Sequence, residues 1–286
     1  RKKGRKNRLS GLPVMGIAKT AAIVLAVVGL VVGVAVLEKY VTSAEKVGAL
    51  ELVGAPGWVN QELKDRITDA AVAYGEDLRI DGDVAESVQS NIESLFAWAT
   101  NVKVQTGLDT ISIIADWRKP VGLVRVGGHK FYVDADMVVL DYVPVAKLAI
   151  VEVTGLAGAK RVPAAGDVWR HEDLAAAVAI LVELGRWDGA RAADKGLLFE
   201  IDRIDVSNFG GRISSKRAHI VLYTKDEIQI IWGAAIEQWQ RYLEAPDEEK
   251  LAKLYAYYKK FGTLLGGARY INLRDPQTEI FQPIDK

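Results

Sequence analysis

The stretch VGALELVGAPG, at residues 47–57, decides how the first half of the chain folds. Over residues 47–53 the odd and even positions form two separate faces, with Leu50 and Leu52 on the same face, which is the period-two pattern of a β-strand. Gly54, Pro56 and Gly57 then end the pattern. The stretch therefore predicts an opening strand followed by a turn into a new element.

Two amphipathic helices and two strands follow this opening strand. The first helix is predicted from residue 60, because apolar residues then recur at steps of three and four. Asp83, followed by Glu86 three residues later, has the pattern of a second helix start. Strands are predicted at 102–106 and 110–117. The order strand, helix, helix, strand, strand predicts a small α+β domain, in which two helices cover a three-stranded sheet.

The remainder of the chain is predicted to be a mixed, β-rich domain with two helices. A hairpin is expected around Gly127 and Gly128. Helices are expected at 171–185 and 247–265 because their apolar residues follow a helical period. Strands are expected at 121–126, 130–133, 137–142, 149–153, 197–206, 218–224, 228–232 and 269–273.

A run of 18 uncharged residues, at 20–37, precedes both domains. As a helix it would cover about 27 Å, so the run predicts a transmembrane helix. The tail at 1–19 carries seven Lys or Arg residues and no acidic residue, and the positive-inside rule then places residues 38–286 outside the cytoplasm. Gly29 and Gly33 have the spacing of a membrane-helix packing motif. The alternative is a cleaved signal peptide that ends near residue 44.

The composition argues against several functional classes. The chain has 37 basic and 37 acidic residues, but seven basic residues lie in the tail, so the rest of the chain has excess negative charge that disfavours nucleic-acid binding. Cysteine is absent, and three scattered histidines do not suggest a catalytic triad. The acidic pairs Asp81/Asp83 and Asp134/Asp136 are typical of turns. We therefore predict no catalytic residues, no metal and no cofactor.

The last predicted strand, 269–273, is the candidate binding element. As the final strand it is expected at or near a sheet edge, where backbone N–H and C=O groups can pair with a strand of a partner protein. The strand at 102–106 is a second and weaker candidate edge.

Several short strings, in their order along the chain, resemble the FtsQ/DivIB family of bacterial cell-division proteins. They are LELVG at 50–54, WRKPVG at 117–122, FYVD at 131–134, IVEVTGL at 150–156, KLAKL at 250–254 and YINLR at 270–274. The resemblance covers nearly the whole chain. It depends on the order of the strings, because none of them is specific alone.

The resemblance implies a bitopic membrane scaffold of the divisome. Its parts would be a cytoplasmic tail at 1–19, a membrane helix at 20–37, a POTRA-like βααββ domain at 45–118 and a β domain at 119–286. The C-terminal edge would receive FtsB/FtsL-like bitopic partners at the division septum and so help to position septal cell-wall synthesis. The candidate partner-binding residues that the resemblance implies are Tyr270, Asn272, Arg274, Gln277 and Phe281.

Two other interpretations remain open on the sequence. One is a membrane-tethered POTRA protein of secretion or outer-membrane assembly. The other is a membrane-anchored cell-wall hydrolase, which requires a carboxylate that is essential for activity in a cleft.

Overall fold

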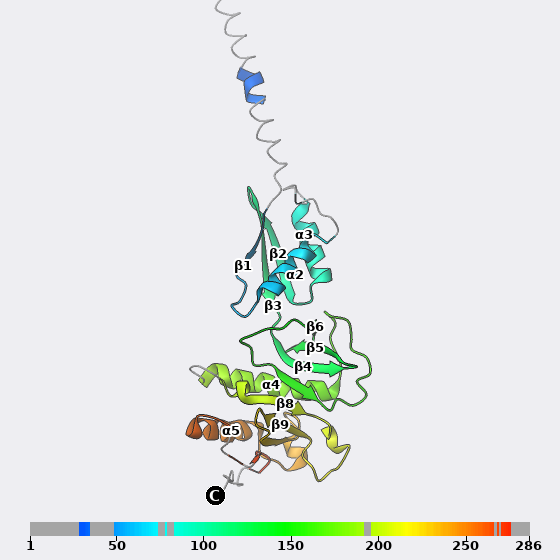
Figure 1. Cartoon of the computed structure of the whole chain (residues 1–286), viewed down its shortest axis with the longest axis vertical. Helices are drawn as coiled ribbons and strands as arrows, with labels where there is room; N and C mark the ends of the chain where they lie inside the picture. Colours follow the sequence, from blue (N-terminus) through cyan, green and yellow to red (C-terminus); the bar gives the residue numbers. More distant parts are fainter. Residues whose placement is uncertain are drawn as a thin grey trace, which may run out of the picture.

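A computed structural model of the chain describes residues 29–34, 49–73, 78, 83–191, 196–265, 268 and 270–275. It has a mixed α+β fold with two separate sheets, which follow one another along the long axis of the molecule (Figure 1). The first sheet belongs to the predicted POTRA-like domain and the second to the predicted β domain.

The first sheet has the strand order β1-β3-β2. Its elements, in chain order, are β1 (Ala49–Val53), α2 (Gln61–Ala71), α3 (Val84–Leu95), β2 (Ala99–Thr106) and β3 (Thr110–Trp117). Strand β1 is parallel to β3, and β2 is antiparallel to it. The Asn60 side chain accepts a hydrogen bond from the Leu63 N–H and so starts α2. Buried apolar residues of α2 and α3, such as Ile67 and Ile92, pack with Ile111 and Ile113 of β3.

The second sheet has eight strands in the order β11-β10-β9-β8-β7-β4-β5-β6. Its strands are β4 (Pro120–Val126), β5 (His129–Asp134), β6 (Val139–Asp141), β7 (Val151–Thr154), β8 (Ile201–Asp205), β9 (Ile220–Thr224), β10 (Gln229–Gly233) and β11 (Tyr270–Asn272). Helices α4 (Glu172–Arg191) and α5 (Asp247–Phe261) pack their apolar residues into one cluster with the inward side chains of these strands. The described part of this domain also contains the short 3-10 helices η2 (Leu197–Glu200), η3 (Phe209–Gly211) and η4 (Trp239–Tyr242).

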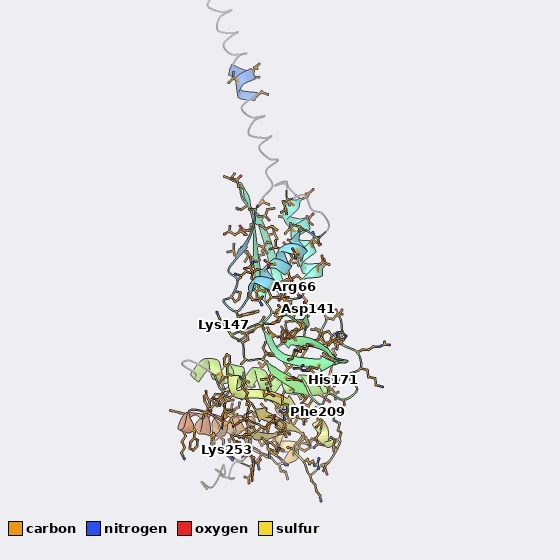
Figure 2. All side chains as sticks on the ribbon, viewed as in Figure 1. Arg66, Asp141, Lys147, His171, Phe209 and Lys253 are labelled. Carbon is orange, nitrogen blue, oxygen red and sulfur yellow. The ribbon has the colours of Figure 1, made fainter. Side chains whose placement is uncertain are left out.

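The two sheets meet at a packed junction around Asp141, at the end of β6. The Trp98 Nε1 donates a hydrogen bond to Asp141 at 3.0 Å, and Arg66 forms an ion pair with the same carboxylate (Figure 2). The Trp98 ring also lies edge-on to Tyr132 of β5, with 5.8 Å between the ring centroids. Burial and the neighbouring Tyr142 raise the pKa of Tyr132 to about 12. A single hydrophobic cluster therefore crosses the junction.

The predicted transmembrane helix is the main correction to the fold class. Within the described ranges, no helix is long and apolar enough to cross a membrane. Residues 29–34, the described part of the predicted span, are helical. The tail and the other residues of 20–37 lie outside the described residues. Gly29 and Gly33 fall in this short helix, and no described atom lies within 4 Å of the Cβ that either would carry.

Several element boundaries also differ from the predictions; α4, for example, continues to Arg191 and not to residue 185. Two of these differences have a cause in the local contacts. Residues 197–200 were expected in a strand but form η2, because the Asp188 carboxylate accepts the N–H groups of Leu197 and Leu198. Helix α5 ends at Phe261 and not at residue 265, because Gly262 adopts a left-handed conformation with φ +73°.

Candidate functional site

Strand β11 lies at one end of the eight-stranded sheet, as the sequence predicts for the last strand. It is parallel to β10, with Ile271 opposite Ile230. The Leu273 N–H donates to the Ile231 carbonyl at 3.0 Å, so Ile271 and Leu273 direct their backbone groups toward β10. Because successive residues of a strand alternate, the backbone groups of Asn272 point away from β10, toward the outer edge.

The local sequence explains why this short segment becomes a strand in this place. Ile271 and Leu273 are fully buried, whereas Tyr270 and Asn272 are half-buried, which is the alternation of a strand with one covered face. A strand that is parallel to its predecessor needs a crossover connection, and α5 supplies it between β10 and β11.

The opposite end of this sheet is closed by the chain itself. The Val139 N–H of β6 donates to the Asp167 carbonyl at 2.9 Å, and the Gly166 N–H donates to the Val139 carbonyl at 2.8 Å. A further bridge joins Val138 to Val168. The β6 end is thus protected by the 164–168 segment, and the β11 end is the better candidate for pairing with another chain.

The outward-facing side chains near β11 border a hollow of about 520 Å³. The hollow lies over strands β8–β11 and is walled by the loop that joins β8 to β9. Cross-strand partners line its floor, since Asp205 is opposite Val221, Val221 is opposite Ile231 and Ile231 is opposite Asn272. Lys216, Arg217 and Arg274 add positive charge around it.

Arg274 is held in place by Glu244, a buried carboxylate on the segment before α5. The Arg274 Nε donates to Glu244 Oε1 at 2.8 Å, and the Lys250 Nζ and the Ala234 N–H each donate to Glu244 Oε2 at 2.8 Å. Gly233 is required beside this carboxylate, because a Cβ at residue 233 would overlap it. The end of β11 is thus tied to both β10 and α5.

His219 is a titratable group close to this cluster. Its ring lies edge-on to Tyr242, with 4.4 Å between the ring centroids. Burial lowers the pKa of His219, Glu244 opposes this effect, and Arg274 adds to it. The imidazole is therefore held in its neutral form over a wider pH range than an exposed histidine.

Lys253 of α5 contacts the outer edge of β11. Its Nζ donates to the Asn272 carbonyl and to the Asp275 carbonyl, in both cases at 3.0 Å. Burial lowers the pKa of Lys253, although Asp275 opposes the shift. The sequence analysis did not identify Lys253 or Glu244, since neither residue interrupts a pattern and their partners are distant in the chain.

Three of the five candidate partner-binding residues are described. Asn272 and Arg274 both line the hollow, and Tyr270 is opposite Gln229, which lines it as well. The structure therefore places these three along one side of the last strand. Gln277 and Phe281 lie outside the described residues.

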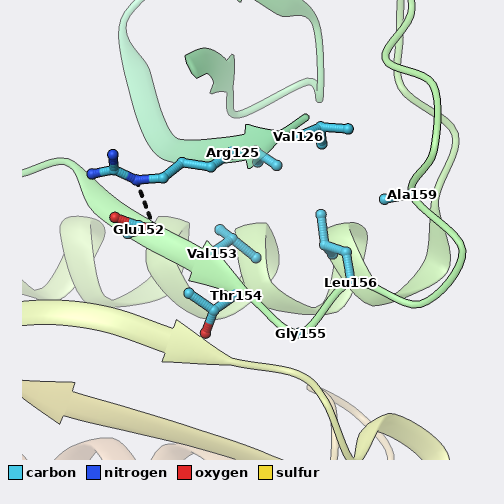
Figure 3. Close-up of a pocket in the computed structure, with 9 residues that line it drawn as sticks. Arg125, Val126, Glu152, Val153, Thr154, Gly155, Leu156 and Ala159 are labelled. Carbon is cyan, nitrogen blue, oxygen red and sulfur yellow. Dashed lines mark hydrogen bonds and ion pairs between the residues drawn. The ribbon is translucent and has the colours of Figure 1, made fainter. Parts of the chain in front are cut away.

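A second, smaller hollow of about 250 Å³ lies at the ends of β4 and β7 (Figure 3). The Arg125 Nε donates a hydrogen bond to the Glu152 carboxylate at 2.9 Å. The two charged side chains that line this hollow are therefore paired with each other. Thr154, Gly155 and Leu156 complete much of its lining. This arrangement gives no reason to expect acid–base chemistry.

The acidic pair at the turn after β5 has a structural role. Asp134 is buried and accepts hydrogen bonds from the Asp136 and Val138 N–H groups, at 2.9 and 2.8 Å. Arg118 also donates to it at 2.9 Å. Asp134 therefore shapes the turn, as the sequence suggests. Asp81 lies outside the described residues.

Comparisons with known proteins leave the family open. No family model matches the sequence, and no curated protein matches it either.

Proposed function

We propose that this chain is a non-enzymatic scaffold of the bacterial division machinery, which acts by binding partner proteins. The observation that carries the proposal is the position of β11 at the end of the second sheet, after a first domain of order βααββ. This arrangement agrees with the order of the FtsQ/DivIB-like strings along the chain. The resemblance supplies the biological setting, and the geometry supplies a binding mode.

In this mode an extended segment of an FtsB/FtsL-like partner pairs with the outer edge of β11. Backbone hydrogen bonds contribute affinity, and side chains on the hollow side contribute specificity. Asn272 and Arg274 meet the partner beside the hollow, together with Tyr270. Bound in this way at the division septum, the chain helps to position the septal cell-wall synthase.

A comparison of two proline variants tests this binding mode. Asn272→Pro removes a backbone N–H that points away from β10, so we expect loss of partner capture with the fold retained. Asn272→Ala removes the side chain but keeps that N–H, and we expect it to retain most of the capture. Ile271→Pro removes a donor that faces β10 and should destabilise the strand itself.

The readout is co-purification of partners with the full chain from bacterial cells, together with the location of a fluorescent fusion. We expect small bitopic division proteins to co-purify and the fusion to lie at midcell. Equal capture by Asn272→Pro and wild type would contradict strand pairing. Recovery of secretion or outer-membrane assembly proteins in place of division proteins would favour the alternative POTRA function.

A further inference from the structure

The outer edge of β11 is occupied by groups of the chain itself. Asn272 uses its carbonyl to accept the hydrogen bond from Lys253, and its side-chain Oδ1 accepts the Arg274 N–H at 3.1 Å. The Arg274 carbonyl accepts the Ala245 N–H at 2.7 Å. The edge is therefore at the end of the sheet, but the carbonyl groups of Asn272 and Arg274 and the Arg274 N–H already have partners within the chain.

These contacts differ in how easily they can be released. The contact between Ala245 and Arg274 is a backbone hydrogen bond between two packed segments. The contact between Asn272 and Arg274 joins residues only two positions apart. Lys253 instead reaches the edge through a flexible side chain of four methylene groups, and it bridges the Asn272 and Asp275 carbonyls. It is half-buried there, and its ammonium group has lost part of its hydration, as its lowered pKa indicates. Moving this side chain returns the ammonium group to water without unfolding any element.

A guest strand needs the acceptor that Lys253 occupies. Pairing at the outer edge requires a guest N–H to reach the Asn272 carbonyl at about 2.9 Å. The Lys253 ammonium group already lies 3.0 Å from that oxygen, and it also donates a hydrogen bond to the Asp275 carbonyl farther along the chain. Lysine is also one of the residues by which proteins protect exposed strand edges.

We propose that Lys253 is a displaceable cap of the β11 edge, which closes the edge in the free protein and must leave before a guest strand can pair. This inference rests on the proposed binding mode at β11. The Lys253 contact would be autoinhibitory, because a guest strand must displace this charged hydrogen-bond donor before it can pair. The free protein would therefore resist nonspecific strand pairing.

The test compares the full chain with Lys253→Met and Lys253→Arg. Methionine keeps an apolar stem without the charge, and arginine keeps a cationic donor. A second copy of the chain is the probe, because uncapped edges pair with each other. Loss of a charged hydrogen bond corresponds to about a tenfold change in an equilibrium constant. The dissociation constant of the Lys253→Met dimer, measured by sedimentation velocity, should therefore be about tenfold lower than that of wild type. Lys253→Arg should resemble wild type.

A double variant tests whether any additional self-association of Lys253→Met occurs through the outer edge of β11. Adding Asn272→Pro to Lys253→Met should abolish the extra association, because proline removes the outward N–H of β11. Unchanged self-association of Lys253→Met, with the Ile271 and Leu273 amides exchanging as slowly as in wild type, would overturn the proposal.

Wild-type protein provides a measurement that does not depend on the variants folding. Lys259 lies on the same helix and is exposed, so it is a matched internal reference. Burial lowers the pKa of Lys253 and so raises its fraction of neutral amine, which is the form that reacts with an amine-acylating reagent. After each rate is corrected for that lysine's neutral fraction, taken from the pH dependence of acylation, a capped Lys253 should react about tenfold more slowly than Lys259. Equal corrected rates would overturn the cap even if Lys253→Met lost the β11 strand.

The cap and the proposed function fail in different ways. If Lys253→Met self-associates through β11 but no variant captures a division partner, the cap is supported and the proposed function is wrong. If wild type and Lys253→Met capture the partner equally well and self-associate equally, the proposed function stands and the cap is wrong.

Discussion

The Nε atom of Arg274 lies 2.8 Å from Oε1 of Glu244, and this contact holds the end of the last strand against the segment before α5. Glu244 is almost fully buried, and its other oxygen accepts a hydrogen bond from Lys250, which is completely buried. The carboxylate thus joins Arg274, a half-buried candidate binding residue, to a charge inside the domain. Arg274 cannot be treated as an independent surface residue.

Glu244→Gln should destabilise the protein strongly. The substitution removes the nearer carboxylate of the buried Lys250 and leaves it only the Asp247 carboxylate, 3.9 Å away. Breaking a buried pair in this way costs about 3 kcal/mol of unfolding free energy. Urea denaturation of the full chain measures the loss. Glu227→Gln is the control, because Glu227 also pairs with an arginine but is exposed, and it should leave the denaturation midpoint unchanged. Equal effects of the two variants would mean that the buried pair has no special role.

Gly155→Ala should be much more damaging than Gly158→Ala. Both glycines have positive φ angles, +80° and +68°, so both substitutions carry the roughly 1 kcal/mol penalty of a left-handed conformation. An added Cβ at Gly155 would also overlap the backbone of Ser207, whereas none of the described atoms lies within 4 Å of one at Gly158. We expect about 3 kcal/mol of destabilisation for Gly155→Ala and about 1 kcal/mol for Gly158→Ala in chemical denaturation. Similar values would show that the turn after β7 can move.

Asp141→Ala should weaken the junction between the two sheets. Trp98 is fully buried, and its indole N–H would lose its acceptor, at a cost of about 2 kcal/mol. Asp116→Ala is a suitable control, because Asp116 accepts a similar side-chain hydrogen bond from Asn101 at an exposed position. Denaturation followed by tryptophan fluorescence should report a large change for the first variant and a change below about 0.5 kcal/mol for the second. A small effect at Asp141 would indicate that packing alone holds the junction.

His219 should make the protein less stable in mild acid. Its pKa is lowered by burial in the folded state, so below about pH 6.5 the unfolded chain takes up a proton that the folded chain does not. The unfolding free energy then falls as the pH decreases, by up to about 1.4 kcal/mol per pH unit, until the lowered folded pKa is reached. His219→Phe keeps a ring beside Tyr242 and should remove this part of the slope. Denaturation midpoints between pH 7 and pH 5 provide the comparison. A variant with the wild-type slope would exclude His219 as the cause.

Much of the local structure follows from the sequence alone. A final strand is predicted at 269–273, where the structure has β11, and helical periodicity predicts α2, α3, α4 and α5. One of the failures has a cause outside the segment itself. Residues 197–200 have the composition of a strand, but the Asp188 carboxylate binds two of their N–H groups and produces η2. The predicted membrane span at 20–37 was inferred from hydropathy, and none of the helices in the described part of the chain is long and apolar enough to cross a membrane.

What the amino-acid sequence determined by itself was therefore the identity of most elements, because hydrophobic period and turn residues act over a few neighbouring positions. The position of the last strand near a sheet edge was also predicted, but only the tertiary structure decided which groups cover that edge. Lys253 lies 19 residues before Asn272, and Glu244 lies 30 residues before Arg274. No periodic signal links such pairs, because their contact depends on how α5 crosses the sheet and on which polar groups remain unsatisfied once the core has packed.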